Sequence, residues 1–310
     1  MSTAAARVAP RPSGEASPAR LSPQLRRQWE HDGFLLLRAS LSRSEVDRAL
    51  AAAAALSATA EPGHVLNVFN IVEKDDAFLD IVDHPSVLGI VADLMGANLQ
   101  LLISQLMIRP PTPSPPLGWH HDGSKPYPFP CVGAIAPLLN LKIGWFLTDV
   151  TSHNEGNLTV VPGSHQRGVQ PPGVGDALEH SAAETTETLT EMPGAVQITA
   201  KAGDAILFHN GLWHSVAPST VARDRIVLYY GYGPSWLRLN DRLAPTPEVL
   251  ARCSPVRQQL LGGLSHPGDH GGMHPGDAGL PLLALLGDGD YTTVMEREFR
   301  EELANYSRSE

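Results

Sequence analysis

Two histidines and one aspartate are the residues whose types and spacing indicate chemistry most clearly. His120 and Asp122 are separated by one residue, so on an extended segment their side chains leave the same face and His121 points the other way. Such a pair recurs by chance, but His214 follows in a short segment after a buried strand. Two imidazoles and one carboxylate on a β scaffold form the facial triad of non-heme Fe(II) oxygenases, which leaves three metal positions open. We therefore predict that His120, Asp122 and His214 are metal ligands and catalytic residues.

Several further motifs accompany these three residues in order along the chain. They include a Trp-His-His-Asp-Gly run, an Asn-Glu-Gly-Asn run that leads to Pro-Gly-Ser-His, and an arginine eleven residues after the second histidine. In order and spacing these motifs resemble the phytanoyl-CoA dioxygenase family of Fe(II)/2-oxoglutarate-dependent oxygenases, over about residues 30–233. The segments that carry the resemblance are residues 33–37, 104–111, 119–123, 154–165 and 203–204, followed by His214 and Arg225.

The resemblance implies a reaction and its cofactors. The expected cofactor is Fe(II), and the expected co-substrates are 2-oxoglutarate and O2. A bidentate 2-oxo acid would take two of the open metal positions and O2 the last. Oxidation of an unactivated C–H bond would then be coupled to the release of succinate and carbon dioxide. Relatives that halogenate have a small residue in place of the carboxylate, so Asp122 favours hydroxylation; desaturation, epoxidation and rearrangement are the alternatives.

Arg225 is predicted, from the resemblance, to hold the far carboxylate of 2-oxoglutarate and to act as a catalytic residue. A guanidinium presents a planar fork that matches a carboxylate, and it keeps its charge when buried. Arg223 competes for this role, but the spacing of eleven residues from His214 matches the family and selects Arg225. Gln105 and Trp145 stand where relatives place residues that line the 2-oxoglutarate site; the alternative for each is a place in the core or in a strand.

One position departs from the family pattern. Some relatives have a small hydroxyl residue two positions after the second histidine, bonded to the co-substrate, but this chain has Val216 there. Ser215 or Ser219 would have to replace that hydroxyl. Asn67 and Asn70 are further candidates for lining the same site.

The segment directly after the metal pair is expected to form part of the substrate pocket. It contains Lys125, Tyr127 and Phe129, and aromatic and basic residues beside the iron have little reason to be buried. Trp213 and Tyr232 are expected to join them. The expected substrate is a small metabolite, such as a biosynthetic intermediate, because the net charge of −10 disfavours a strongly anionic acyl-CoA.

The remaining histidines are expected to be structural. His165 lies in a Pro-Gly-Ser-His turn, His153 in a polar turn and His209 on an apolar strand, where a hydrogen-bonded core histidine is the commoner outcome. Residues 262–280 hold three histidines among glycines and prolines. Without the spacing of a known metal site, this segment is expected to be a mobile loop rather than a metal tract.

The bulk composition disfavours several classes of protein. The chain has 310 residues, 42% of them hydrophobic, and a formal net charge of −10, which disfavours nucleic acid or an anionic membrane as a partner. Its two cysteines are too few for a disulfide framework, and no apolar run reaches the roughly 20 residues of a membrane span. The N-terminus lacks the apolar stretch of a signal peptide, so the expected location is cytoplasmic. The oligomeric state has no readable signal.

The elements that position these residues are predicted to form a double-stranded β-helix, a cupin-like jelly roll that is mainly β with flanking helices. Residues 1–21 indicate a flexible tail and residues 22–310 a single domain, with loop insertions at about 166–193 and 262–280. Helices are expected over residues 22–33, after Ser42, over residues 85–96 and near residues 295–306. Strands are expected at residues 34–37, 64–72, 99–109, 136–149, 157–161, 195–199, 204–209 and 225–232.

Two other functions fit parts of the pattern. One is a redox-inert, metal-dependent isomerase or hydrolase on the same jelly-roll scaffold, with Zn(II) or Mn(II) and water as the fourth ligand. Such an enzyme would not need Arg225 and would ignore 2-oxoglutarate and O2. The other is a catalytically silent binding protein that has kept the fold. The intact triad and Arg225 argue against it, because such proteins usually lose a ligand first.

Overall fold

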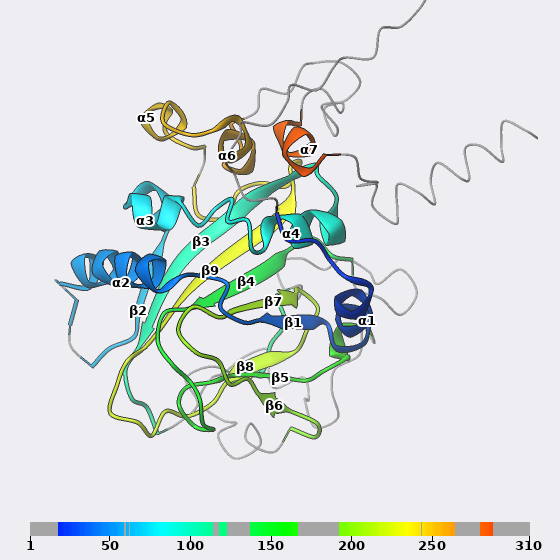
Figure 1. Cartoon of the computed structure of the whole chain (residues 1–310). Helices are drawn as coiled ribbons and strands as arrows, with labels where there is room; N and C mark the ends of the chain where they lie inside the picture. The colour runs from blue at the N-terminus through cyan, green and yellow to red at the C-terminus, as the bar shows by residue number, and fades with distance from the viewer. Residues whose placement is uncertain are drawn as a thin grey trace, which may run out of the picture.

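Two antiparallel sheets form the centre of the molecule (Figure 1). The computed structural model describes residues 18–58, 60–61, 63–113, 118–122, 137–166, 192–242, 244–263 and 280–287. The larger sheet has six strands in the order β1-β7-β4-β9-β3-β2, and the smaller has three in the order β6-β5-β8. The strands are β1 Phe34–Leu37, β2 Leu66–Phe69, β3 Leu99–Arg109, β4 Leu141–Phe146, β5 Leu158–Val160, β6 Val196–Gln197, β7 Ala205–His209, β8 His214–Val216 and β9 Arg225–Pro234. This arrangement is the predicted jelly roll.

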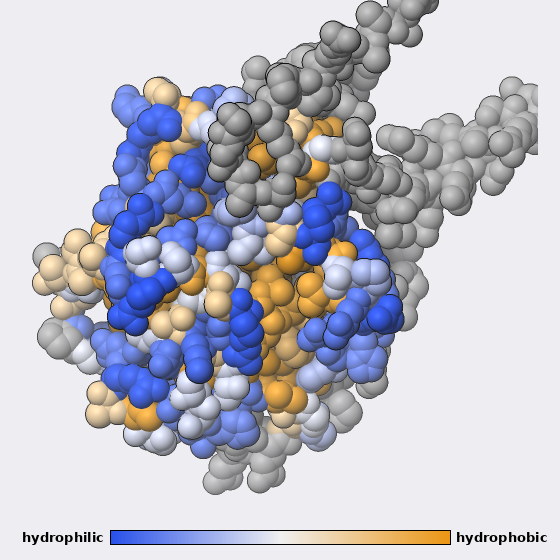
Figure 2. Space-filling model, viewed as in Figure 1, coloured by the Kyte–Doolittle hydropathy of each residue, from blue (hydrophilic) through white to orange (hydrophobic). Residues whose placement is uncertain are grey.

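Helices pack on the face of the larger sheet that points away from the smaller sheet (Figure 1). The helices of the described residues are α1 Pro23–Asp32, α2 Arg43–Ser57, the 3-10 helix η1 Ile71–Glu73, α3 Asp76–Leu79, α4 Leu88–Met95, α5 Pro247–Leu250, α6 Pro255–Leu260 and α7 Pro281–Leu286, and a further 3-10 helix, η2 Ser164–Gln166, follows β5 of the smaller sheet. None of the helices in the described ranges is long and apolar enough to cross a membrane. The visible surface is largely hydrophilic, with hydrophobic residues gathered over β1 and β7 beside α1 (Figure 2).

The strands β3, β4, β7 and β9 of the larger sheet are buried on both faces, so their side chains alternate between two cores. Leu106 and Leu228 point toward the helices, whereas Met107, Val227 and Tyr229 point toward the smaller sheet. The inner core, between the sheets, contains Phe34, Phe146, Val150, Leu158, Val160, Ile198, Ala200, Ile206, Phe208, Leu212, Val227 and Tyr229. Because this inner core is apolar, each polar or charged side chain that points into it requires a specific partner or ligand.

The expected helix ends near the N-terminus are confirmed. The Ser22 side chain accepts a hydrogen bond from Leu25 N at the start of α1, and Gly33 ends that helix with a φ of 77°. Ser42 and Glu45 form the capping box of α2. These signals are local, which is why they can be read from the sequence alone.

Two details between residues 75 and 96 differ from expectation. The helix expected from residue 85 begins only at Leu88, because His84 Nδ1 and the Ser86 hydroxyl lie 2.7 Å apart in a turn that precedes it. The short helix α3 was not expected. Its available signal was Asp75, whose side chain accepts a hydrogen bond from Ala77 N.

The last residues of the expected tail are bound to the domain, so the boundary at residue 21 was wrong. Ala19 N donates to Pro85 O at 2.8 Å, and Arg20 forms an ion pair with Asp93 at 2.6 Å. A Cβ on Gly89 would collide with the Ala19 carbonyl, so the glycine lets this segment cross α4. Residues 1–17 lie outside the described part of the chain, as do most of both expected insertions and the helix expected near residues 295–306.

Two histidines and a tryptophan pack together where α1 meets β7. His209 lies 5.2 Å from His165 and 6.0 Å from Trp29, measured between ring centroids. Its Nδ1 accepts a hydrogen bond from Gly211 N at 2.8 Å. Burial, together with the charges of His165 and His121, lowers the pKa of His209 to about 3. The expected structural role of His209 agrees with this environment, in which the ring stays neutral.

Acid should therefore destabilise the metal-free protein partly through His209. Between pH 6.5 and the folded pKa of about 3, the unfolded chain binds a proton that the folded chain does not, so the free energy of unfolding falls as pH falls. The expected loss is about 1.4 kcal/mol per pH unit for this residue. In denaturant titrations at pH 7.5, 6.5 and 5.5, His209→Asn should have a shallower pH dependence than the wild type. An unchanged slope in the variant would contradict this prediction.

Candidate metal centre and co-substrate site

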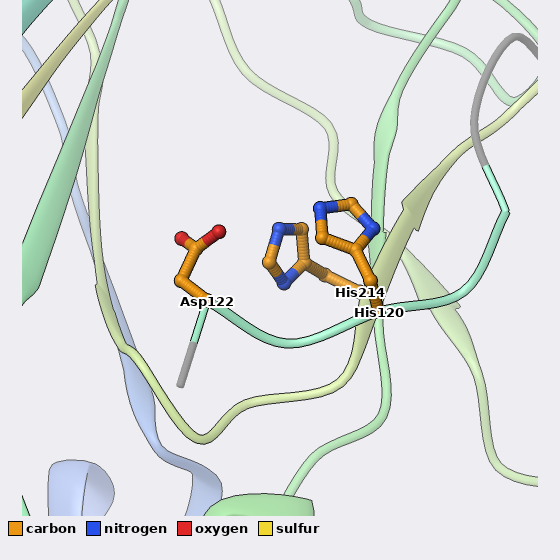
Figure 3. Close-up of side chains that lie close together, drawn as sticks. All are labelled: His120, Asp122 and His214. Atoms are coloured by element: carbon orange, nitrogen blue, oxygen red, sulfur yellow. The ribbon is translucent and has the colours of Figure 1, made fainter. Parts of the chain in front are cut away.

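His120, Asp122 and His214 lie together in the structure. One ligand atom from each, a ring nitrogen or a carboxylate oxygen, lies within 4.8 Å of the other two. His120 and His214 pair through their backbones, since His120 N donates to His214 O at 3.0 Å and His214 N to His120 O at 2.8 Å. This bridge places the two rings 4.2 Å apart, and Figure 3 shows the Asp122 carboxylate turned toward them.

Both imidazoles are oriented for metal binding in the same way, by a hydrogen bond to a backbone carbonyl two residues earlier. His120 Nδ1 lies 2.9 Å from Gly118 O, and His214 Nδ1 lies 2.9 Å from Leu212 O. A backbone carbonyl can only accept, so each Nδ1 carries the proton and each Nε2 keeps a free lone pair. Burial and the neighbouring His120 lower the pKa of His214 to about 3. His214 is therefore neutral at physiological pH and binds a metal without first losing a proton.

Asp122 lies beside Lys142, a residue that the sequence analysis did not assign to the site. Lys142 Nζ of β4 is 2.8 Å from Asp122 Oδ2. Burial alone would raise the pKa of Asp122, but Lys142, His214 and His120 outweigh it and hold the pKa well below its usual range. The carboxylate is ionised, and Lys142 is the partner of its buried Oδ2 atom. Two imidazole nitrogens and a carboxylate oxygen around one space fit Fe(II).

Arg225 is buried inside the barrel, whereas its competitor Arg223 lies at the surface. Arg225 is 3% exposed, and its Nη2 donates to the Tyr229 hydroxyl at 2.8 Å. Its Nε is buried and has no hydrogen-bond partner. Arg223 has a 46% exposed side chain and pairs with Glu155 at 2.9 Å. Of the two, only Arg225 faces the interior with donors free for a ligand.

The two expected co-substrate residues lie on opposite faces of the larger sheet. Gln105 is opposite Tyr229 in the β3–β9 register and points inward, where its side chain donates to Asn67. Trp145 points outward, into the core beneath the helices, with its ring 5.6 Å from that of His84. The period of two in β4 that turns Lys142 inward turns Trp145 away. The expectation that Trp145 lines the co-substrate site was therefore wrong.

Two other residues that were expected at the site have structural contacts instead. Asn70 caps η1 with a φ of 53° and donates to Glu73, so its role is structural. Tyr232 also points outward and donates to Val82 O at 2.6 Å, which removes it from the pocket.

Trp213 is buried in a small cluster with Trp119 and Met192. Its ring lies 5.0 Å from that of His121. The expected role of Trp213 in substrate binding stays a prediction. Lys125, Tyr127 and Phe129 lie outside the described residues, so their expected role in substrate binding stays a prediction.

The missing hydroxyl beside the second histidine has one structural substitute. The Ser219 hydroxyl is buried and has no hydrogen-bond partner. A Cβ built on Gly156 would touch both the Arg225 side chain at 3.3 Å and the Ser219 Cβ at 3.6 Å, so the serine is close to the arginine. Ser215 takes the opposite face of β8 from His214 by alternation. Ser219 is therefore the better candidate.

Three interior polar residues were missed at the sequence level, namely Lys142, Tyr229 and Arg109. Lys142 is a lone cation in an apolar strand, which was its only available signal. Tyr229 crosses Gly144 of β4, where a Cβ would lie 3.0 Å from the Tyr229 ring. Assigning these residues to the site requires the strand register, which is a non-local property.

The remaining histidines have the structural environments that were expected. His165 is buried beneath Gly33, where a Cβ would collide with its ring. His153 is exposed in a turn. His121 points away from the metal ligands toward Trp213, and burial lowers its pKa.

Comparison with known proteins extends the likeness beyond the motifs. The family model of phytanoyl-CoA dioxygenase matches residues 29–227. L-proline trans-4-hydroxylase from Streptomyces griseoviridis is 26% identical over 257 residues, which cover 76% of this chain and 90% of that protein. Ectoine dioxygenase from Nocardia farcinica is 27% identical over 213 residues, which cover 61% of this chain and 70% of that protein.

Solved structures share the fold at lower identity. HygX from Streptomyces hygroscopicus, solved with iron bound, has a TM-score of 0.56 at 16% identity and covers 76% of this chain and 95% of its own. The α-ketoglutarate-dependent epimerase SnoN from nogalamycin biosynthesis has a TM-score of 0.52 at 23% identity. The match covers 68% of this chain and 80% of SnoN.

Removal of the Lys142 charge should strengthen binding of a divalent cation. The ammonium group lies 2.8 Å from the carboxylate that would bind the metal, so it repels the metal ion and competes with it. Lys142→Met should bind Fe(II) about tenfold more tightly than the wild type in anaerobic equilibrium dialysis. Lys142→Arg keeps the charge and should behave like the wild type. Weaker binding by Lys142→Met would mean instead that the lysine holds Asp122 in place.

Proposed function

Because the chain belongs to the phytanoyl-CoA dioxygenase family and is a non-heme Fe(II)- and 2-oxoglutarate-dependent dioxygenase, we propose that His120, Asp122 and His214 hold its iron. We propose further that the enzyme hydroxylates an unactivated C–H bond of a small metabolite. The observation that carries the proposal is the cluster of three ligand atoms within 4.8 Å of one another. The two backbone-anchored Nδ1 atoms support it, since they leave both Nε2 atoms free for the metal.

The chain's own residues have separate tasks in this reaction. Bound Fe(II) supplies the activation of O2, coupled to oxidative decarboxylation of 2-oxoglutarate to succinate and carbon dioxide. Arg225 binds the far carboxylate of 2-oxoglutarate and so fixes which end of the molecule faces the metal ligands. Phe208, whose ring lies 5.1 Å from that of His214, keeps that side of the site apolar and excludes water.

The proposed substrate is a small metabolite, a biosynthetic intermediate with an unactivated C–H bond. Two relatives are named for proline and ectoine, and HygX was solved with hygromycin B. The retained Asp122 carboxylate supports hydroxylation. SnoN, named as an epimerase, supports one second outcome, the inversion of a stereocentre by the same cofactors. The described cysteine, Cys253, is a free thiol, which agrees with the proposed cytoplasmic location.

An anaerobic titration tests the proposal directly. Fe(II) followed by 2-oxoglutarate should produce the weak visible charge-transfer band of the chelate, and admission of O2 should bleach it with formation of succinate. Asp122→Ala should lose the band because it removes a metal ligand. Arg225→Ala should require about 10- to 100-fold more 2-oxoglutarate to reach the same absorbance, as expected for lost hydrogen bonds to a charged group.

Arg223→Ala is the matched control, since this arginine lies at the surface and should leave the titration unchanged. Tight Zn(II) binding without any band would support the redox-inert isomerase or hydrolase. Equal weakening by Arg223→Ala and Arg225→Ala would contradict the assignment of Arg225.

A further inference from the structure

Two buried arginines stand side by side inside the barrel. Arg109, the last residue of β3, is directly opposite Arg225, the first residue of β9. Arg109 is 6% exposed and Arg225 is 3% exposed. Residues that are opposite each other in an antiparallel pair present their side chains on the same face. Both guanidinium groups are therefore on the inner face of the larger sheet.

Both side chains run inward from the edge of the barrel. Arg109 Nε lies 3.0 Å from the Met107 sulfur, two residues back along β3. Arg225 Nη2 reaches the Tyr229 hydroxyl, four residues ahead along β9. The strands are antiparallel, so these two directions are the same direction in space. The Tyr229 hydroxyl therefore contacts Arg225 on the same inner face of the sheet that carries Arg109.

This arrangement is unfavourable without an anion. Burial and the charge of Arg225 lower the pKa of Arg109. Across the described ranges, no carboxylate forms an ion pair with either arginine, and the nearby Glu155 is bound to Arg223 and to the backbone of Thr151. A buried charge needs a partner of opposite sign, and two like charges need it more. The Arg225 Nε and the Ser219 hydroxyl add buried donors that lack an acceptor.

We propose that Arg109 and Arg225 together bind the far carboxylate of 2-oxoglutarate, one guanidinium from each of two adjacent strands, with the Tyr229 hydroxyl as a third donor. A carboxylate accepts about four hydrogen bonds, so it can satisfy two guanidinium groups and a hydroxyl at once. Arg109 is then a second binding residue for the co-substrate. The inference rests on the proposed function, because it assigns one end of the 2-oxo acid to this pair.

The pair should make the site selective for a 2-oxo acid with a second carboxylate. Fe(II)-loaded protein would be titrated anaerobically with 2-oxoglutarate and with 2-oxobutanoate, which has the same 2-oxo acid end but no far carboxylate. In Arg109→Met the dissociation constant for 2-oxoglutarate should rise about 10- to 100-fold, while that for 2-oxobutanoate should stay within about twofold. Arg109→Lys keeps the charge but loses the planar guanidinium fork. Its dissociation constant for 2-oxoglutarate should lie between those of the wild type and Arg109→Met.

Two results would overturn the assignment. An unchanged affinity for 2-oxoglutarate in Arg109→Met would mean that the arginine serves another anion, such as an acidic group of the substrate. An equal loss for both acids would mean that the variant disturbs the site as a whole, and Arg109 would then be structural.

Thermal unfolding without metal provides a second readout. Arg109→Met removes one of two repelling buried charges, so the apo-variant should melt at or above the wild-type temperature. A structural arginine would lower that temperature on removal. Addition of 2-oxoglutarate should raise the melting temperature of the wild type more than that of the variant, since binding to the folded state alone stabilises it.

The two proposals fail in different ways. If wild-type protein gives no charge-transfer band with Fe(II) and 2-oxoglutarate, the proposed function fails. In that case, stabilisation of the metal-free wild type by 2-oxoglutarate, and its loss in Arg109→Met, would still support the arginine pair. No stabilisation of the wild type would overturn it. If every Arg109 variant gives the charge-transfer band at the same 2-oxoglutarate concentration as the wild type, the proposed function stands. Only the role of Arg109 in binding 2-oxoglutarate is then excluded.

Discussion

The pairing of β3 with β9 is the constraint on which the rest of the structure depends. These long strands run antiparallel from Leu99 opposite Pro234 to Arg109 opposite Arg225. Helices cover one face of the pair and the smaller sheet covers the other. A change of register would therefore turn each side chain toward the wrong core. A shift of one residue would turn Arg225 and Tyr229 into the helical core. The register therefore decides which residues face the proposed co-substrate site.

Metal binding depends on a much smaller contact. One antiparallel bridge joins His120 to His214, and it links a loop segment to the three-stranded sheet. The same geometry directs each Nδ1 to a carbonyl two residues earlier. The chain thus orients both imidazoles through backbone groups. Because Lys142 comes from the other sheet, the metal centre lies where the two sheets face each other.

Charge balance connects the metal centre to the co-substrate site. Lys142, Arg109 and Arg225 point into an interior that is lined largely by apolar side chains, and Asp122 is the carboxylate that the described residues place there. Such an excess of buried cations is costly in the free protein. It favours a ligand with two negative groups, and 2-oxoglutarate carries two carboxylates. The cost in the free protein and the proposed affinity for the co-substrate have the same physical origin.

The sequence by itself determined the features that depend on local spacing. His120 and Asp122 share a face because they are two residues apart, and the caps of α1 and α2 depend on neighbours within three or four residues. The jelly roll was expected from the succession of short strands and from the resemblance to the family, and that resemblance also brought His214 into the triad and favoured Arg225 over Arg223. The anchoring of residues 18–21 across α4 was not, because it depends on Gly89 and Asp93, far along the chain.

Only the tertiary structure decided which face each strand residue takes. β4 is buried on both sides, so hydrophobicity cannot distinguish the inward Lys142 from the outward Trp145. The approach of Arg109 to Arg225 likewise requires the register of two strands that are more than a hundred residues apart in sequence. Side-chain alternation is a local rule, but its phase relative to the barrel is set by packing between distant segments.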